Sequence, residues 1–307
     1  MKKIADYDTI NYDYSTYWEK REYEHKSEVI LLEKLLSKEK GNWFLDIGGS
    51  YGRLLPTYYD KFSHPVIVDY SLKTLQKNYS DIKKKYPNVQ LIAANAYYLP
   101  FKGNSFDGCM MVRVLHHINE PKKVLNEIYR LLSKNAIYIQ EYANKLHIKA
   151  VIRAIVKLDF SIFSKEAYQQ PNKENYEGTR KNIQIPFLNY HPKEIRNIIS
   201  KSGFSILKKY GCSFFRIDFL KNNIKVDTLL FWENILQNSI SFLTLSPSIF
   251  LKSTKKESPS LSKQDSLEDI LVCPKCKKEL DIEGSAAKCK KCALSFKKKK
   301  NIWDFRI

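Results

Sequence analysis

Residues 44–52 read FLDIGGSYG and decide the fold expected for this chain. Three of the chain's ten glycines fall here, at positions 48, 49 and 52, directly after an apolar run. Glycine adopts backbone conformations that other residues avoid and lets a ligand approach the main chain. The helix that follows would offer free N–H groups to negative charge. A strand that runs into such a turn predicts a cofactor site at its carboxyl end.

Apolar runs and helical stretches alternate around this turn. Short runs typical of buried strands occur at 43–47, 65–68, 89–93, 106–112 and 137–140, and helical patterns occur at 71–86 and 121–132. Ahead of them, apolar residues recur at helical spacing at positions 29, 30, 32, 35 and 36. The alternation predicts βαβ units, and therefore an α/β fold in which helices cover both faces of a parallel sheet.

The pattern changes after residue 141. We expect an amphipathic helix at 146–158, a polar, tyrosine-bearing insertion at 164–189, a helix at 192–202 and late strands at 205–208 and 213–216. Residues 221–251 are apolar enough to pack, but the pattern assigns them no element. Residues 253–268 are rich in serine and lysine, which is typical of a linker, and a compact cysteine-containing module follows.

The spacing of the glycines distinguishes among cofactors. A dinucleotide site needs G-x-G-x-x-G, but counting from Gly48 the later positions hold serine and arginine. The phosphate-binding pattern G-x-x-x-x-G-K-[ST] is absent as well. The stretch from Asp46 to Gly52 instead resembles the first motif of class I S-adenosylmethionine methyltransferases, an acidic residue followed by glycines two, four and six positions later. Ser50 departs from this motif, and we expect Gly49 to supply the missing backbone freedom.

The resemblance continues through the next four strands. Asp69 and Tyr70 end the second strand, and the family's ribose ligand carries over to Asp69, whose carboxylate can accept from two hydroxyls. The segment SFDGCMMVRVLHHI, residues 105–118, resembles UbiE-like methyltransferases (methyltransferase type 11). The resemblance implies a Rossmann-like class I methyltransferase sheet with S-adenosylmethionine as cofactor. The residues that would bind the cofactor are Asp46, Gly48, Gly49, Gly52, Asp69, Tyr70, Asn95, Ala96 and Arg113, with Asn95 and Ala96 on adenine.

Several of these residues have a second interpretation. Asp46 could simply organise the turn, and Arg113 could be a solvent-facing charge rather than part of the cofactor pocket. We interpret His116 and His117 as structural, because they begin a helix. The lead-in around Tyr17 and Trp18 resembles a segment that folds over the cofactor in relatives, but core packing or a surface position would explain it equally. Methyl transfer from a sulfonium mainly requires alignment, so we assign no catalytic residue.

Four cysteines near the C-terminus have the spacing of a zinc ribbon. Cys273, Cys276, Cys289 and Cys292 form two C-x-x-C pairs. Each pair can aim two thiolates at one ion, and four thiolates predict a closed, structural Zn²⁺ site. The strings LVCPKCKKEL, KCKKCALSF and NIWDF resemble small zinc-ribbon proteins that activate tRNA and translation-factor methyltransferases. The expected organisation is a methyltransferase domain at 1–252 (core 27–142, substrate-side insertion 143–190), a linker at 253–268 and a zinc ribbon at 269–307.

Charge leaves the partner open. Lys and Arg number 52 against 33 Asp and Glu, a net charge of +19, which favours nucleic acid or anionic membrane, although biased base composition of the gene would have the same effect. Basic residues recur at every fourth position, 145, 149, 153 and 157, beside the apolar face of the helix at 146–158. They could touch an anionic membrane or a lipid-like substrate, or form a solvated face over core contacts. With neither a run of about 18 apolar residues nor a secretory signal, we expect a cytoplasmic protein.

Three functional hypotheses remain open. The first is a methyltransferase that acts on a small or lipid-like acceptor. The second puts the acceptor on RNA or on a translation protein that the basic zinc ribbon docks. The third is a non-catalytic adaptor that binds the cofactor without transferring its methyl group.

Overall fold

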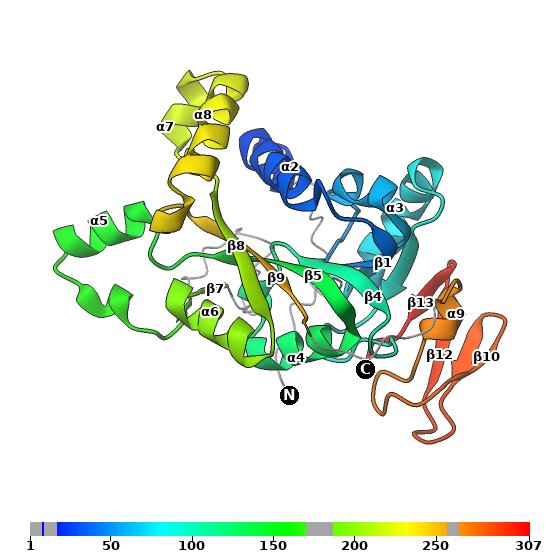
Figure 1. Ribbon diagram of the computed structural model, residues 1–307. Helices are drawn as coiled ribbons and strands as arrows, with labels where there is room; N and C mark the ends of the chain where they lie inside the picture. The colour runs from blue at the N-terminus through cyan, green and yellow to red at the C-terminus, as the bar shows by residue number, and fades with distance from the viewer. Residues whose placement is uncertain (1–7, 9–16, 170–186, 257–263) are drawn as a thin grey trace.

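A mixed sheet of eleven strands organises the molecule (Figure 1). The computed structural model describes residues 8, 17–169, 187–256 and 264–307. The central strands are β1 (Gly41–Ile47), β2 (Phe62–Asp69), β3 (Gln90–Ala93), β4 (Phe106–Met111), β5 (Leu132–Ala143), β8 (Ser205–Cys212) and β9 (Ser248–Thr254), in the order β3-β2-β1-β4-β5-β9-β8. The first five run parallel, and β9 runs antiparallel to both of its neighbours. The predicted parallel α/β core is therefore confirmed.

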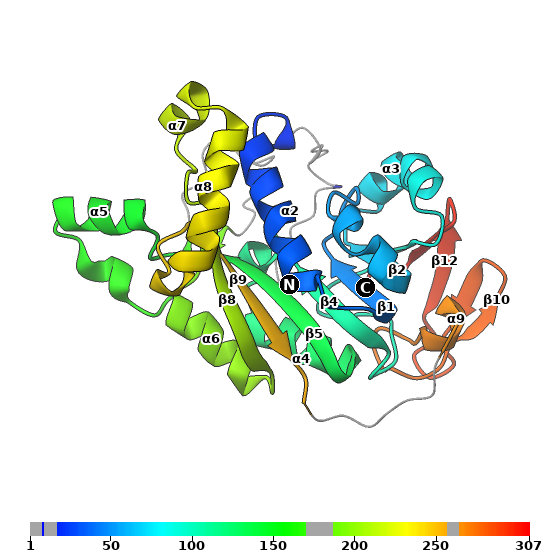
Figure 2. The same cartoon turned by 45° about the horizontal axis from the view of Figure 1, so that its top comes forward.

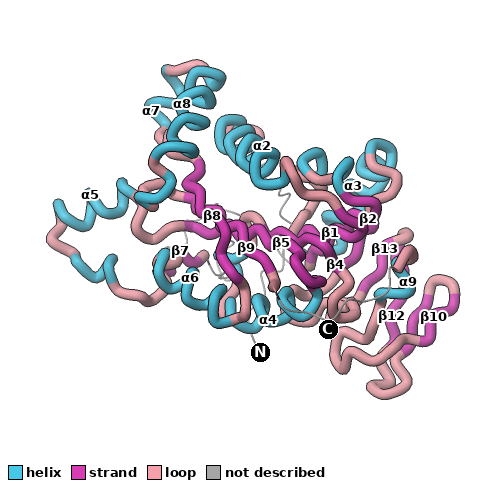
Figure 3. Tube along the Cα trace, in the orientation of Figure 1, coloured by secondary structure: helices cyan, strands magenta, loops and turns pink. Residues whose placement is uncertain are grey.

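Helices cover both faces of this sheet (Figure 3). On one face lie α2 (Glu22–Leu36) and α3 (Leu72–Lys85), and on the other lie α4 (Pro121–Leu131) and α6 (Pro192–Lys201). Successive residues of β1 point to opposite faces, as expected for a strand: Phe44 packs with the apolar side chains of α2 and α3, whereas Leu45 packs with those of α4 and α6. The sheet is thus buried on both sides.

The late elements differ from the sequence expectation. Residues 213–216 form a turn rather than a strand, because the backbone N–H groups of Ser213 and Phe214 donate to the buried Glu233 carboxylate, at 2.7 and 3.0 Å, instead of to a neighbouring strand. The unassigned stretch contains α8 (Val226–Ser239) and β9. Because β9 extends to Thr254, the sheet reaches two residues into the expected linker. The remainder of that linker lies partly outside the described residues.

The C-terminal module continues the same sheet (Figure 2). It comprises α9 (Leu267–Ile270), β10 (Asp281–Glu283), β11 (Ala286–Lys288), β12 (Ser295–Lys299) and β13 (Ile302–Asp304). Strand β13 pairs parallel with β3, so that Trp303 lies beside Ile92 and Asp304 beside Ala93. Trp303 and Phe305 are fully buried in one core cluster with residues of β1, β2 and β4. The module and the methyltransferase-like core therefore share a hydrophobic core.

None of the helices in the described ranges is both long and apolar enough to cross a membrane.

Candidate cofactor site and adjoining cavity

A cavity lies at the carboxyl ends of β1, β2, β3 and β4, where parallel sheets commonly bind ligands. Eight of the nine residues expected to bind the cofactor line it: Asp46, Gly48, Gly49, Asp69, Tyr70, Asn95, Ala96 and Arg113. Gly52 does not line it. Its positive φ of 76° and its N–H bond to the Gly49 carbonyl at 2.8 Å close the turn from behind. The structure thus gathers the expected residues around one space, and their binding roles remain predictions.

Certain positions of the turn between Asp46 and Gly52 accept glycine and no larger residue. Gly48 has a φ of 75°, and a Cβ there would lie 2.1 Å from Val114 Cγ2, so a side chain cannot fit. Ser50 itself has a φ of 49°, in the left-handed region. The expectation that Gly49 supplies the missing freedom is wrong, because Gly49 has no positive φ. Gly49 is required for close packing instead, since a Cβ would lie 2.8 Å from Asp46 Oδ2.

Asp69 is held by backbone donors from two segments. The N–H groups of Ser50 and Ser71 donate to its two carboxylate oxygens at 3.0 and 2.8 Å. Burial is the main influence on this group and raises the pKa of Asp69 to about 6. Each carboxylate oxygen keeps a further acceptor position. The side chain is therefore fixed in place and can still accept hydrogen bonds from a ligand in the cavity.

Asp46 lies beneath the turn with its side chain almost fully buried. The Tyr58 hydroxyl donates to its Oδ2 at 2.9 Å. Burial raises the pKa of Asp46 to about 7, although the Tyr58 bond opposes this shift. The carboxyl group lies close to Gly49 and borders the cavity, and its role in cofactor binding stays a prediction.

The expected adenine contacts lie after β3. Asn95 is buried, and its Oδ1 accepts from the Tyr97 N–H at 3.0 Å. This bond fixes the side chain and leaves Oδ1 one further acceptor position. Tyr70 borders the cavity on the β2 side, and its carbonyl accepts from Arg306 Nη1 at 3.3 Å. The last residues of the chain therefore contact the rim of the cavity.

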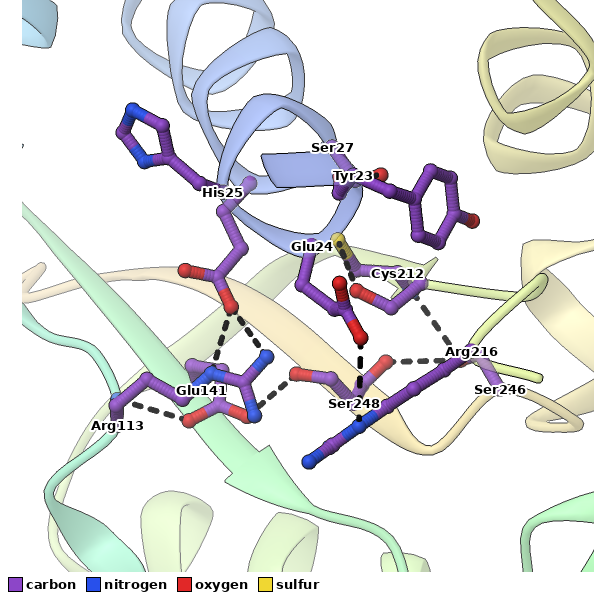
Figure 4. Close-up of polar contacts among 12 residues, drawn as sticks. Tyr23, Glu24, His25, Ser27, Arg113, Glu141, Cys212, Arg216, Ser246 and Ser248 are labelled. Atoms are coloured by element: carbon purple, nitrogen blue, oxygen red, sulfur yellow. Dashed lines mark hydrogen bonds and ion pairs between the residues drawn. The ribbon is translucent and has the colours of Figure 1, made fainter. Parts of the chain in front are cut away.

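Arg113 belongs to a buried charge network rather than to the solvent-facing surface (Figure 4). Its guanidinium contacts Glu28 Oε1 at 2.6 Å from Nε, and its backbone N–H donates to Glu141 at 2.9 Å. Glu28 also pairs with Arg53 at 2.6 Å. Two arginines hold the pKa of the fully buried Glu28 below its usual range against the opposing effect of burial. Since both arginines line the cavity, this network fixes one wall of it.

The N-terminal part of the chain brings two contacts to this wall, and the one from helix α2 was not predicted from the sequence. Glu28 anchors Arg53 and Arg113, and the buried Trp18 ring stacks on the Arg53 guanidinium at 3.6 Å. Trp18 was considered for this position, but Glu28 was not. A signal existed, because Glu28 lies three and four residues before Leu31 and Leu32, within the apolar stripe of the helix. A charged residue in such a stripe indicates a buried partner.

A second cavity, of about 230 Å³, has Arg113 in its wall, as the first cavity does. Its other walls are formed by residues that follow β4, by the start of α5 (Ile148–Val156), and by residues around 187–189, 214–217 and 245–247. Imidazoles of His116 and His147 face it. Burial, followed by nearby positive charge, lowers the pKa of His116 well below its usual range and that of His147 to about 4. Both rings are therefore neutral near pH 7 and can accept a hydrogen bond.

The four cysteines of the C-terminal module meet at one point. Their Sγ atoms all lie within 4.8 Å of one another, and those of Cys276 and Cys289 are 3.5 Å apart. Zn–S bonds of about 2.3 Å in a tetrahedron place sulfur atoms about 3.8 Å apart, whereas a disulfide needs about 2 Å. The arrangement fits a structural Zn²⁺ with Cys273, Cys276, Cys289 and Cys292 as ligands.

Comparisons with known proteins agree with this geometry. Residues 45–139 match the family described as a methyltransferase domain. Uncharacterized protein MJ1252 of Methanocaldococcus jannaschii is 28% identical over 72% of this chain and 82% of its own length. Demethylmenaquinone methyltransferase of Renibacterium salmoninarum is 35% identical, but the match spans 30% of this chain and 37% of that protein.

A solved structure has a similar fold. It is a chain from the complex between the Haloferax volcanii Trm112 methyltransferase activator and a methyltransferase, with a TM-score of 0.53 and 13% identity. The match covers 83% of this chain and 98% of that one.

Proposed function

The chain carries an S-adenosylmethionine-dependent methyltransferase domain, and from this premise we propose that it methylates a small, apolar acceptor bound in the second cavity. The observation that carries the proposal is a second cavity that has Arg113 in its wall, as the first cavity does. The first has the position and residues expected for the cofactor. The second is lined by aromatic, aliphatic and imidazole groups together with the cations Arg113, Lys149 and Arg216.

The chain's own residues would hold both reactants. Asp69 would accept from the cofactor's ribose, and the turn at Gly48 would let its methionine end approach the main chain. When bound, S-adenosylmethionine supplies a methyl group activated by the positive sulfur. The cavity walls would align the acceptor and exclude water. His116 and His147, both neutral, would accept a hydrogen bond from an acceptor hydroxyl and orient it.

Similarity to a demethylmenaquinone methyltransferase supports an apolar acceptor for this chain. The free cysteines of the described residues fit a reducing compartment, and we place the protein in the cytoplasm on this ground.

The test is transfer of a tritiated methyl group into cell extract, separated afterwards into lipid, RNA and protein fractions. We expect label in the organic-soluble fraction, and Asp69→Ala should reduce it. Calorimetric titration of the same preparations with S-adenosylmethionine separates binding from transfer. Cofactor binding without label in any fraction would instead support a non-catalytic adaptor. Absence of cofactor binding would overturn the proposal.

A second candidate function is favoured by the C-terminal module. Lys288, Lys290, Lys291, Lys297, Lys299 and Lys300 are exposed on it, and a solved methyltransferase of similar fold was captured with an activator protein. These lysines could dock RNA or an acidic protein surface. Label confined to the RNA or protein fraction, and lost when Lys290 and Lys291 are changed to Glu, would establish this function in place of the first.

A further inference from the structure

An exposed apolar element extends from one end of the molecule. It consists of α5 and the following 3-10 helix η5 (Phe160–Phe163), which project away from the sheet in both orientations (Figures 1 and 2). Seven of its large apolar side chains are exposed: Ile148, Ile152, Ile155, Val156, Leu158, Phe160 and Phe163. Val156 and Leu158 are 78% and 76% exposed. Core packing of the apolar face, one of the two expectations for this helix, is therefore largely absent.

Helix α5 packs against η5, and its small residues lie on one side. At 100° per residue, Ala150 and Ala154 lie on one side, and Ala154 is the buried residue of the helix. Ile148, Ile152 and Val156 lie within an arc on the opposite side, and Arg153 and Lys157 lie between the two. One flank of the exposed apolar arc thus carries cations, a feature of helices that lie in a membrane interface.

The loop after the helix is held in place by a buried lysine. Lys145 Nζ donates to the carbonyls of Ser164 and Glu166 at 3.0 and 2.8 Å. Lys149 Nζ donates to the Arg216 carbonyl at 2.7 Å and ties the start of α5 to the body. Both anchors keep the apolar side chains presented to the outside, so exposure does not arise from a loose end.

We propose that residues 148–163, here called the docking element, insert into the surface of an anionic lipid bilayer. The charge supports this partner, because the segment from 145 to 169 has five basic residues against two acidic ones, on a chain of net charge +19. Apolar side chains would enter the acyl boundary while Arg153 and Lys157 contact lipid phosphates. A second copy is disfavoured as the occupant, since a two-fold interface would bring these like charges together.

The docking element also borders the second cavity. His147, Ile148 and Lys149 line that cavity at the start of α5. Resting on the proposed function, this position lets an apolar acceptor pass from the bilayer along α5 toward Arg113. Bilayer binding and the identity of the acceptor are separate properties, and they can be measured separately.

The test is flotation of the full-length chain with vesicles, without cofactor. One set is pure phosphatidylcholine, and the other contains equal parts of phosphatidylcholine and phosphatidylglycerol. We expect binding to the anionic set, reduced about tenfold by Val156→Glu with Leu158→Glu, and reduced on that set by Arg153→Glu with Lys157→Glu. Leu207→Glu is the matched control, because Leu207 is 54% exposed on β8, outside the docking element.

Each outcome decides the proposal. The proposal would be overturned if the wild-type protein did not bind to anionic vesicles. The proposal would also be overturned if light scattering showed a dimer that dissociates when Val156 and Leu158 are changed, since a second copy would then cover the docking element. Unchanged melting temperature and cofactor affinity in the variants would show that the fold is intact. Vesicle binding together with methyl label outside the lipid fraction would keep the docking element and reject the apolar acceptor.

Discussion

Ser50 occupies a backbone conformation that usually selects glycine. Its φ of 49° lies in the left-handed region, and its N–H donates to Asp69. A β-branched side chain fits this region poorly. We therefore expect Ser50→Val to lower the free energy of unfolding by about 1–2 kcal/mol and to weaken cofactor binding. Chemical denaturation and calorimetry would measure both effects.

The matched variant at this position is Ser50→Gly. It relieves the backbone strain but gives the unfolded chain more freedom, so its stability should stay within about 1 kcal/mol of wild type. Equal losses from Val and Gly would show that the serine hydroxyl, rather than φ, matters here.

Asp69 should make cofactor binding depend on pH. Ribose hydroxyls are donors, and an ionised carboxylate accepts from both of them. Because the pKa of Asp69 is raised to about 6, its carboxylate is protonated below this pH, and it must lose that proton before it can accept from both hydroxyls. We expect the Kd to increase as pH falls through 6, by at most about tenfold per pH unit. Calorimetry from pH 5 to 8 in matched buffers would measure the slope.

Asp69→Asn isolates this effect from the nearby Asp46, whose pKa is raised to about 7. The variant should bind more weakly by about 1–3 kcal/mol at pH 8 and lose the step near pH 6. A step that survives the substitution belongs to Asp46 or to another group, and would reject the assignment of Asp69.

At the scale of elements, α2 is fastened to the cavity by one carboxylate. Glu28 is buried between Arg53 and Arg113, so Glu28→Gln removes the negative charge that two buried cations share. We expect a loss of about 3–5 kcal/mol in unfolding free energy and weaker cofactor binding, because both arginines line the cavity. Glu33→Gln on the exposed side of the same helix is the control, and it should change stability by less than about 0.5 kcal/mol.

The elements could be predicted from sequence where periodicity was strong. The first five strands and the helices between them follow from alternating apolar runs, and their order agrees with the expected fold. β9 was missed because its assignment depends on pairing with β5 and β8, more than a hundred and about forty residues away respectively. The strand expected at 213–216 failed because Glu233, from a distant helix, takes its backbone donors. A local sequence pattern cannot predict contacts with residues that are distant in the chain.

The candidate site shows the same division. Residues that follow the motif, such as Gly48 and Asp69, could be located because backbone geometry fixes their relation to the strands. Glu28 holds two arginines of the cavity wall and His147 lines the second cavity, both from other segments, and only Glu28 has a weak signal in the sequence. The second cavity depends on the packing of α5 against the late loops, which composition does not encode.

At the scale of the whole molecule, the C-terminal module acts as an extension of the sheet. The sequence predicted a separate ribbon behind a linker, and the four cysteines do meet as expected. What it did not reveal is that β13 pairs with β3 and that Trp303 enters the main core. A short strand beside an edge strand has no local signature. The pairing covers an edge of the sheet that would otherwise be open to other strands.

Because the sheet is continuous, we expect the predicted zinc site to affect the stability of the main domain as well as that of the module. Lys277 bonds to the Leu99 carbonyl at 3.0 Å and pairs with Glu127, while Arg306 reaches the Tyr70 carbonyl at the rim of the cofactor cavity. A module too small to fold without its metal would release these contacts when the metal is lost. We expect one zinc per chain by atomic emission. Removal by a chelator should lower the melting temperature by about 4–8 °C, corresponding to about 2 kcal/mol.

Cofactor affinity should fall with the metal, because β13 and Arg306 support the ends of β3 and β2 that border the cavity. Arg306→Ala separates the two effects: it should weaken cofactor binding a few-fold while zinc stays bound, and Lys290→Ala, at an exposed lysine on the same module, should change neither. Restored zinc should recover both melting temperature and affinity. A metal-free chain that binds the cofactor as tightly as the loaded one would show that the sheet edge does not transmit the state of the module to the site.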